Sequence, residues 1–185
     1  MSTGTLLAII IPVVVVLALI AVGASLLTRR RRLRRRFGPE YERTVEQAES
    51  RQAGERRLRE REKRHDQLDI RPLSADVRER YAREWSGVQE EFVDRPEEAV
   101  HDADRLVTSL MHERGYPTEG FEQQAADLSV EHSRTLDHYR AAHDIETLTT
   151  RSQATTEQLR GAMVHYRVLF DELLSDGSRP RHAPS

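Results

Sequence analysis

An uncharged apolar run near the amino terminus constrains this chain more than any other feature. It extends from Leu6 to Leu27, twenty-two residues without a single charge. At about 1.5 Å of rise per residue, a helix of this length is about 33 Å long, which matches the hydrocarbon thickness of a bilayer. In lipid the backbone polar groups must bond to one another, so a helix is the expected conformation. The sequence therefore predicts a transmembrane helix over residues 6–28.

An arginine cluster follows the apolar run directly. Its members fill seven of eight positions and are Arg29, Arg30, Arg31, Arg32, Arg34, Arg35 and Arg36. The segment before the run, residues 1–5, carries no basic side chain. The positive-inside rule then places residues 1–5 outside and the bulk of the chain in the cytoplasm. Within the juxtamembrane segment 29–37, the arginines are candidates for contact with anionic lipid headgroups, which makes the lipid bilayer the first predicted partner.

A cleaved secretory signal is the alternative interpretation of the apolar run. Such a signal has a basic segment before a shorter apolar core, and a small-residue cleavage site after it. Ala21, Gly23, Ala24 and Ser25 offer a poor cleavage site, but the basic cluster lies on the wrong side. We therefore favour a retained anchor, with secretion as the alternative. The spacing of Ala21 and Ser25 also leaves a weak homodimer open, because small residues four apart let two helices pack closely.

The rest of the chain is acidic. The net charge is −2, but seven of the 29 basic residues precede Phe37, whereas all 31 acidic residues follow it. The remaining 22 basic residues give the part beyond the arginine cluster a net charge of −9, which argues against a nucleic-acid partner. Cysteine is absent, which excludes a disulfide framework and cysteine-ligated metal sites.

A charged connector is expected after the arginine cluster. Phe37-Gly38-Pro39 predicts a helix break, and residues 38–73 then consist mainly of charged residues that favour a helix. Glu55 with Arg59 is one of two acid-first pairs at four-residue spacing that stabilise an exposed helix. The apolar heptad from Tyr41 ends after two turns, so we expect a solvated connector helix rather than a stable coiled coil.

Amphipathic patterns predict a helical bundle over residues 74–174. Four stripes of apolar residues recur at helical spacing. They are Val77, Tyr81, Trp85, Val88 and Phe92; Ala99, Val100, Ala103, Leu106, Val107, Leu110 and Met111; Leu136, Tyr139, Ala142, Ile145 and Leu148; and Leu159, Met163, Tyr166, Leu169, Phe170, Leu173 and Leu174. No segment after the apolar run shows a strand pattern. The predicted fold class is therefore all-α, with an N-terminal transmembrane helix, a connector helix and a C-terminal bundle of about four helices.

Several residues mark the expected helix boundaries. Ser74 is a good N-cap for the first bundle helix, and Gly115 is a plausible residue after the end of the second. Residues 119–128 are expected to form a short helix or an irregular segment, and Ser129 or Ser133 to open the third long helix. Thr155 with Gln158 resembles a capping box. The tail, 175–185, is polar and predicted to be disordered.

The sequence contains no motif that indicates a particular enzymatic reaction. Glu98 and His101 have the Glu-x-x-His spacing of di-iron bundles, but that site needs a second such pair. His138 and His143 are five apart, so they lie on different faces of a helix. His165 is expected to have a structural role beside the core stripe. Phosphate loops, nucleophile elbows and zincin motifs are absent from the sequence. We therefore predict no catalytic residue, no cofactor and no metal ligand.

Two stretches combine aromatic, basic and histidine side chains. They suggest a polar partner-binding patch that comprises His112, Arg114, Tyr116, Tyr139, Arg140 and His143. The alternative is a helix terminus with packed aromatic rings and arginines that cover them. An enzyme or ligand site around Arg114, Tyr139, Arg140 and His143 is the further alternative.

Six stretches, two of which overlap the predicted patch, resemble a known family. The sequence resembles a family of actinobacterial single-pass membrane proteins, sometimes labelled secreted, with a C-terminal helical domain. The resemblance covers nearly the whole chain after the apolar run. It rests on residues 37–41, 71–74, 92–94, 114–117, 139–143 and 159–174. It implies membrane association or secretion, and it brings no activity and no site residues with it.

Taken together, these patterns predict a membrane-anchored, non-enzymatic interaction protein at the cytoplasmic face of the plasma membrane. Its protein partner is not specified by the sequence. An architectural spacer that associates with itself through residues 40–68 is a third hypothesis.

Overall fold

The computed structural model describes residues 3–175, and within its first helix the side chains of residues 3–13, 15, 18, 22 and 26 lie outside that description. The described chain is all-helical, as predicted, and no described residue forms a strand. Its helices are α1 (Thr3–Phe37), α2 (Pro39–Glu46), α3 (Arg51–His65), α4 (Ala75–Asp94), α5 (Pro96–Glu113), α6 (Phe121–Glu131), α7 (Leu136–Thr150) and α8 (Thr156–Ser175).

Two compact units make up the chain. The first comprises residues 1–59, and the second comprises residues 60–185, so the boundary falls inside α3. Among the described residues, no helix combines the length and the apolar character that a membrane crossing requires. The predicted span, residues 6–28, falls in large part on side chains outside the description. The predicted tail also lies outside it, apart from Ser175, which ends α8.

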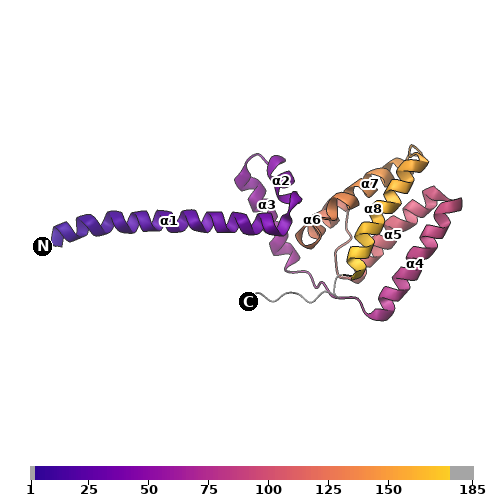
Figure 1. Ribbon diagram of the computed structural model, residues 1–185, viewed down its shortest axis with the longest axis horizontal. Helices are drawn as coiled ribbons and strands as arrows, with labels where there is room; N and C mark the ends of the chain where they lie inside the picture. Colours follow the sequence, from indigo (N-terminus) through magenta and orange to yellow (C-terminus); the bar gives the residue numbers. More distant parts are fainter. Residues whose placement is uncertain (1–2, 176–185) are drawn as a thin grey trace. The chain divides into compact units, whose positions relative to one another are not determined.

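In the first unit, α1 is a single long helix that includes both the apolar run and the arginine cluster (Figure 1). It ends at Phe37, as predicted, because Gly38 adopts a positive φ of 48° and Pro39 begins α2. A packing contact joins α1 and α2. The predicted break at Phe37-Gly38-Pro39 is therefore confirmed.

The prediction of one connector helix is wrong, because the chain turns back between Gln47 and Ser50. Ser50 Oγ accepts a hydrogen bond from the Ala53 N–H at 3.2 Å and caps a new helix, α3. At one point α3 lies very close to α2, since a Cβ atom on Gly54 would lie 2.8 Å from Val45 Cα. A side chain at this position would collide with the α2 backbone, so the approach requires glycine at Gly54.

The second unit contains a bundle of four long helices, α4, α5, α7 and α8, with the shorter α6 beside α7 (Figure 1). Helix α5 packs against α4, α7 and α8, and α7 also packs against α8. The predicted bundle is confirmed. All seven apolar positions predicted for α5 are buried.

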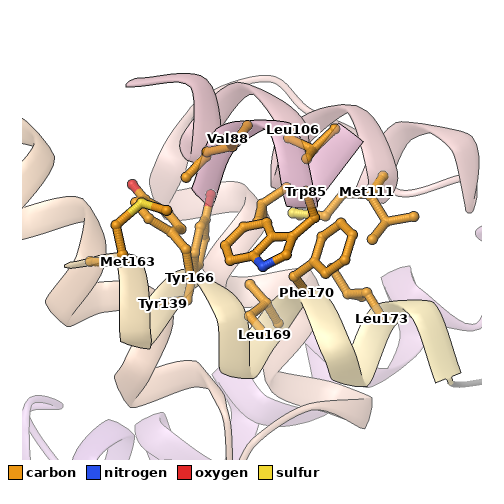
Figure 2. Packing of buried hydrophobic residues seen from close by; sticks show 14 of the residues in the cluster. Trp85, Val88, Leu106, Met111, Tyr139, Met163, Tyr166, Leu169, Phe170 and Leu173 are labelled. Atoms are coloured by element: carbon orange, nitrogen blue, oxygen red, sulfur yellow. The ribbon is translucent and has the colours of Figure 1, made fainter. Parts of the chain in front are cut away.

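The core is formed mainly by the predicted stripes (Figure 2). On α8, six of the seven predicted residues are buried, and Leu174 is partly buried. On α4, Tyr81, Trp85 and Val88 are buried, whereas Val77 and Phe92 pack against the core at its edge. The Trp85 and Phe170 rings stack between α4 and α8, with their centroids 4.7 Å apart. Aromatic contacts of this kind join the first bundle helix to the last.

Helix ends in the bundle follow the predicted signals in two places. After α5, Gly115 has φ 93° and its N–H bonds to the His112 carbonyl at 2.9 Å, while the Tyr116 N–H bonds to the Met111 carbonyl at 3.0 Å. These two bonds form a Schellman motif. At the start of α8, the Gln158 N–H donates to Thr155 Oγ1 and the Thr155 N–H donates to Gln158 Oε1 at 2.8 Å, which confirms the capping box.

The start of the third long helix was predicted wrongly. Ser129 lies inside α6, and α7 begins only at Leu136. His132 is the C-cap of α6, and its carbonyl accepts hydrogen bonds from the Thr135 N–H and hydroxyl, both at 3.0 Å. This tight turn ends one helix and begins the next, without an N-cap bond from either serine.

Candidate functional site

A pocket lined by arginines lies in the first unit, between α1 and α3. Its volume is about 520 Å³. Helix α1 contributes Leu27, Arg29, Arg30 and Leu33, and the turn before α3 together with α3 contributes Ser50, Gln52, Glu55, Arg56 and Arg59. We call this site the arginine pocket. It begins at Leu27, the last residue of the apolar run.

The charge inside the arginine pocket is strongly positive. Four guanidinium groups and one carboxylate, that of Glu55, line it. Glu55 Oε1 accepts a hydrogen bond from Tyr41 Oη at 2.7 Å, and burial, followed by this carboxylate, raises the pKa of the tyrosine. Within the described part of the chain, none of the four arginines has a carboxylate ion-pair partner.

One nitrogen in the arginine pocket lacks a hydrogen-bond acceptor. Arg30 Nε is buried, and no described residue accepts a hydrogen bond from it. A buried charged donor without an acceptor is costly, and its positive charge is left uncompensated by a hydrogen bond at this nitrogen. The N-terminus of α3, with Ser50 and Gln52, also lines the pocket, and helix N-termini favour anions. The arrangement therefore suits an anion with several acceptor oxygens.

The rest of the predicted arginine cluster lies outside the arginine pocket. Arg31, Arg32, Arg35 and Arg36 line a shallower hollow of about 570 Å³ with Thr28. Arg34 forms an ion pair with Glu42 of α2. The structure thus divides the cluster, and only Arg29 and Arg30 lie in the pocket that α3 completes.

The predicted partner patch does not form one surface. Arg114 and Tyr116 are buried in the second unit. Arg114 Nη1 donates to the Leu173 carbonyl at 2.9 Å, so the guanidinium caps the carboxyl end of α8. Tyr116 Oη lies 3.2 Å from His132 Nε2, and His132 Nδ1 lies 2.9 Å from Glu172 Oε1. Both predicted residues thus stabilise the fold.

Helix α7 contributes the other half of the predicted patch. Tyr139 is buried and donates a hydrogen bond to Gln124 Oε1 of α6. The half-buried His143 stacks on Phe121, with centroids 3.7 Å apart, and Arg140 forms an ion pair with Asp137 at 3.4 Å. His112 is exposed. Because three of the six residues, Arg114, Tyr116 and Tyr139, are buried, the six side chains do not together present an exposed binding surface.

A second pocket combines carboxylates with a histidine in the bundle. It has a volume of about 450 Å³ and is lined by Glu98, His101, Asp102, Asp104, Arg105 and Glu146. His101 Nδ1 lies 3.1 Å from Glu146 Oε1, and Tyr166 Oη donates to Asp104 Oδ1 at 2.8 Å. Burial raises the pKa of Asp104, which the nearby Glu146 carboxylate raises further, while the Tyr166 hydrogen bond opposes that shift.

His138 of α7 and His165 of α8 form a pair in the bundle. His138 Nδ1 and His165 Nδ1 lie 2.9 Å apart, and burial followed by His138 lowers the pKa of His165. Over residues 3–175, wherever side chains are described, no three histidine, aspartate or glutamate side chains are arranged to hold a metal ion. The predicted structural role of His165 agrees with this pairing.

An apolar groove of about 210 Å³ lies between α4 and α8. Its lining residues are Trp85, Gln89, Phe92, Arg160, Met163, Val164 and Arg167. Val164 is 58% exposed, although it lies among apolar neighbours. Arg167 Nη1 donates to Gln89 Oε1 at 3.0 Å across the groove. The buried Trp85 Nε1 has no hydrogen-bond acceptor among the described residues.

The arginine pocket was not predicted from the sequence, because it forms only where two separate helices pack together. Arg56 and Arg59 were assigned to a solvated connector, and only the turn at Ser50 brings them to the arginine pocket. The signal that could have located this turn is Ser50 itself, a favoured N-cap residue before a run of helix formers.

Comparison of the chain with protein-family models, with curated proteins and with solved structures gave no match.

Proposed function

We propose that this chain is a membrane-anchored, non-enzymatic helical adaptor at the cytoplasmic face of the plasma membrane. In this proposal residues 6–28 cross the bilayer once, residues 29–37 lie at its cytoplasmic surface, and the bundle binds a protein partner. The observation that carries it is the order of the sequence, in which twenty-two uncharged residues precede seven arginines. The uncharged residues are stable in the hydrocarbon core of a bilayer, and the arginines are attracted to anionic headgroups at its surface.

Charge supports the proposed orientation. The segment before the apolar run has no basic residue, whereas the segment after it has seven. This asymmetry keeps the arginines in the cytoplasm. The acidic body beyond them has a net charge of −9 and would be repelled by an anionic surface. The bundle is therefore expected to extend into the cytoplasm, where it can contact a partner.

The groove between α4 and α8 is the surface that we assign to the protein partner. Its apolar wall includes the exposed Val164, and two guanidinium groups, those of Arg160 and Arg167, flank that wall. A helix that presents an apolar side chain beside acidic residues complements this pattern. We therefore propose an acidic amphipathic helix as the occupant.

Site-specific photocrosslinking in cells tests this assignment. A benzophenone amino acid at Val164 should crosslink to one discrete protein, and R160Q/R167Q should reduce that crosslink severalfold. The control position is Thr150, which is also exposed but lies outside the groove. The same adduct from both positions, or no adduct from Val164, would contradict the assignment.

The anchor is tested separately by extraction. The full chain should remain in the membrane pellet at alkaline carbonate pH, whereas a chain that lacks residues 6–27 should be released. Release of the full chain would contradict membrane anchoring. A purified full chain that turns over a substrate would contradict the non-enzymatic role.

A further inference from the structure

We infer that the arginine pocket binds the phosphate of one anionic phospholipid headgroup, with Arg29 and Arg30 of α1 and Arg56 and Arg59 of α3 as its ligands. This inference rests on the proposed membrane anchor. It goes beyond diffuse attraction to the membrane, because it names a formed pocket and assigns two residues that lie far from the arginine cluster in the sequence.

The chemistry of the lining residues points to a phosphate. Guanidinium groups match phosphate oxygens through paired N–H donors. Four such groups line the pocket, and the described residues give none of them a carboxylate ion-pair partner. Arg30 Nε is buried and lacks an acceptor among those residues, which adds to the uncompensated positive charge at this site. The N-terminus of α3 adds donors at the same site.

The single carboxylate in the pocket does not cancel this charge. Glu55 Oε1 already accepts a hydrogen bond from Tyr41 Oη at 2.7 Å. Its backbone carbonyl accepts a hydrogen bond from Arg59 Nε at 3.2 Å, which leaves the terminal nitrogens of Arg59 to other acceptors. Three positive charges therefore remain in excess among the lining residues.

The position of the pocket points to a lipid rather than to a soluble phosphate. Leu27 lines the pocket and is also the last residue of the apolar run. Arg30 follows it after three residues, a rise of about 5 Å along the helix, which is the depth of the headgroup layer next to the hydrocarbon. Leu27 adds an apolar wall that can contact the glycerol end of the acyl chains.

Native mass spectrometry of the full-length protein in a nonionic detergent tests the inference. The probes are dihexanoyl phosphatidylglycerol, dihexanoyl phosphatidylcholine and glycerol 3-phosphate, and the variants are R56Q/R59Q and R31Q/R35Q. Both variants remove two positive charges, but Arg31 and Arg35 lie outside the arginine pocket. We expect the wild type to bind one phosphatidylglycerol molecule at least tenfold more tightly than either other probe.

The variants distinguish the pocket from diffuse charge. R56Q/R59Q should weaken phosphatidylglycerol binding about thirtyfold, and R31Q/R35Q should leave it within about twofold. An equal loss of phosphatidylglycerol affinity in both variants would overturn the assignment of the arginine pocket as the binding site. Equal affinity for glycerol 3-phosphate would overturn the lipid as its occupant.

Carbonate extraction of the same variants separates this inference from the proposed function. If R56Q/R59Q stays in the membrane pellet while its lipid binding is lost, the inference is supported. If the wild type stays in the pellet without preferring phosphatidylglycerol, the inference alone fails. If the wild type is released from the pellet, the proposed anchor fails as well.

Discussion

The indole of Trp85 on α4 stacks on the ring of Phe170 on α8, with a centroid separation of 4.7 Å and an interplanar angle of 22°. Both side chains are buried, and they join the first and last helices of the bundle across the core. Trp85 is also the only tryptophan in the chain. Its fluorescence therefore reports on the second unit alone, without a signal from the long helix α1.

Phe170→Ala should destabilise the second unit by about 3–5 kcal/mol, because it removes a fully buried ring and leaves a cavity beside Trp85. Urea unfolding of the full chain in detergent, followed by Trp85 fluorescence, measures this loss. Val93→Ala is the control, because Val93 is 82% exposed, and it should change the free energy of unfolding by less than about 0.5 kcal/mol. Similar losses of unfolding free energy in both variants would contradict the burial of Phe170 in the core.

Gly115→Ala should cost at least about 2 kcal/mol of stability, because alanine resists the left-handed backbone that closes α5. Its φ is 93°, and a Cβ atom there would lie 2.3 Å from the Asp69 carbonyl oxygen. Gly87→Ala provides the matched control. Gly87 lies in α4 with no atom within 4 Å of its added Cβ, so alanine should stabilise the helix by about 0.5–1 kcal/mol. Urea unfolding followed by Trp85 fluorescence measures both changes in the free energy of unfolding. Changes of the same sign in the two variants would contradict the Schellman motif at Gly115.

Asp104 should make the bundle less stable as the pH rises. Burial raises its pKa in the folded protein above the ordinary value of 3.8. The folded state therefore holds its proton more tightly than the unfolded state, and this contribution is complete below the unfolded pKa and is lost as the pH rises through the folded pKa.

Asp104→Asn removes that titration and keeps an oxygen that can accept the Tyr166 hydrogen bond. The difference in unfolding free energy, variant minus wild type, should therefore increase as the pH rises above 3.8. His101, His143 and Glu146 remain in both proteins, so their titration largely cancels from that difference. Urea unfolding at a series of pH values measures it, and a difference that does not change with pH would refute the role of Asp104.

Much of the second unit could be predicted because its helices have one buried face. The stripe from Ala99 to Met111 locates every buried hydrophobic residue of α5, since helical spacing alone determines which side chains face the core. Gly115, Thr155 and Gln158 gave local signals for helix ends. Such features depend on neighbours within a few residues, so they can be recognised in a single sequence.

Neither the arginine pocket nor the burial of residues in the predicted partner patch could be predicted in this way. Arg56 reaches the pocket only because α3 turns back beside α1, and Arg114 is buried because it caps α8, whose Leu173 is 59 residues away. Exposed and buried arginines look alike in a sequence, since the partner that compensates a buried charge comes from a distant segment.

Reporter fusions to the carboxyl terminus after Ser185 test the central claim most directly. Alkaline phosphatase is active only outside the cytoplasm, whereas green fluorescent protein exported in an unfolded state fluoresces only inside. The proposed orientation predicts a fluorescent fusion and an inactive phosphatase fusion, both retained in the membrane fraction. An active phosphatase with a dark fluorescent fusion, or either fusion recovered from the culture medium, would contradict a cytoplasmic helical body on a membrane anchor.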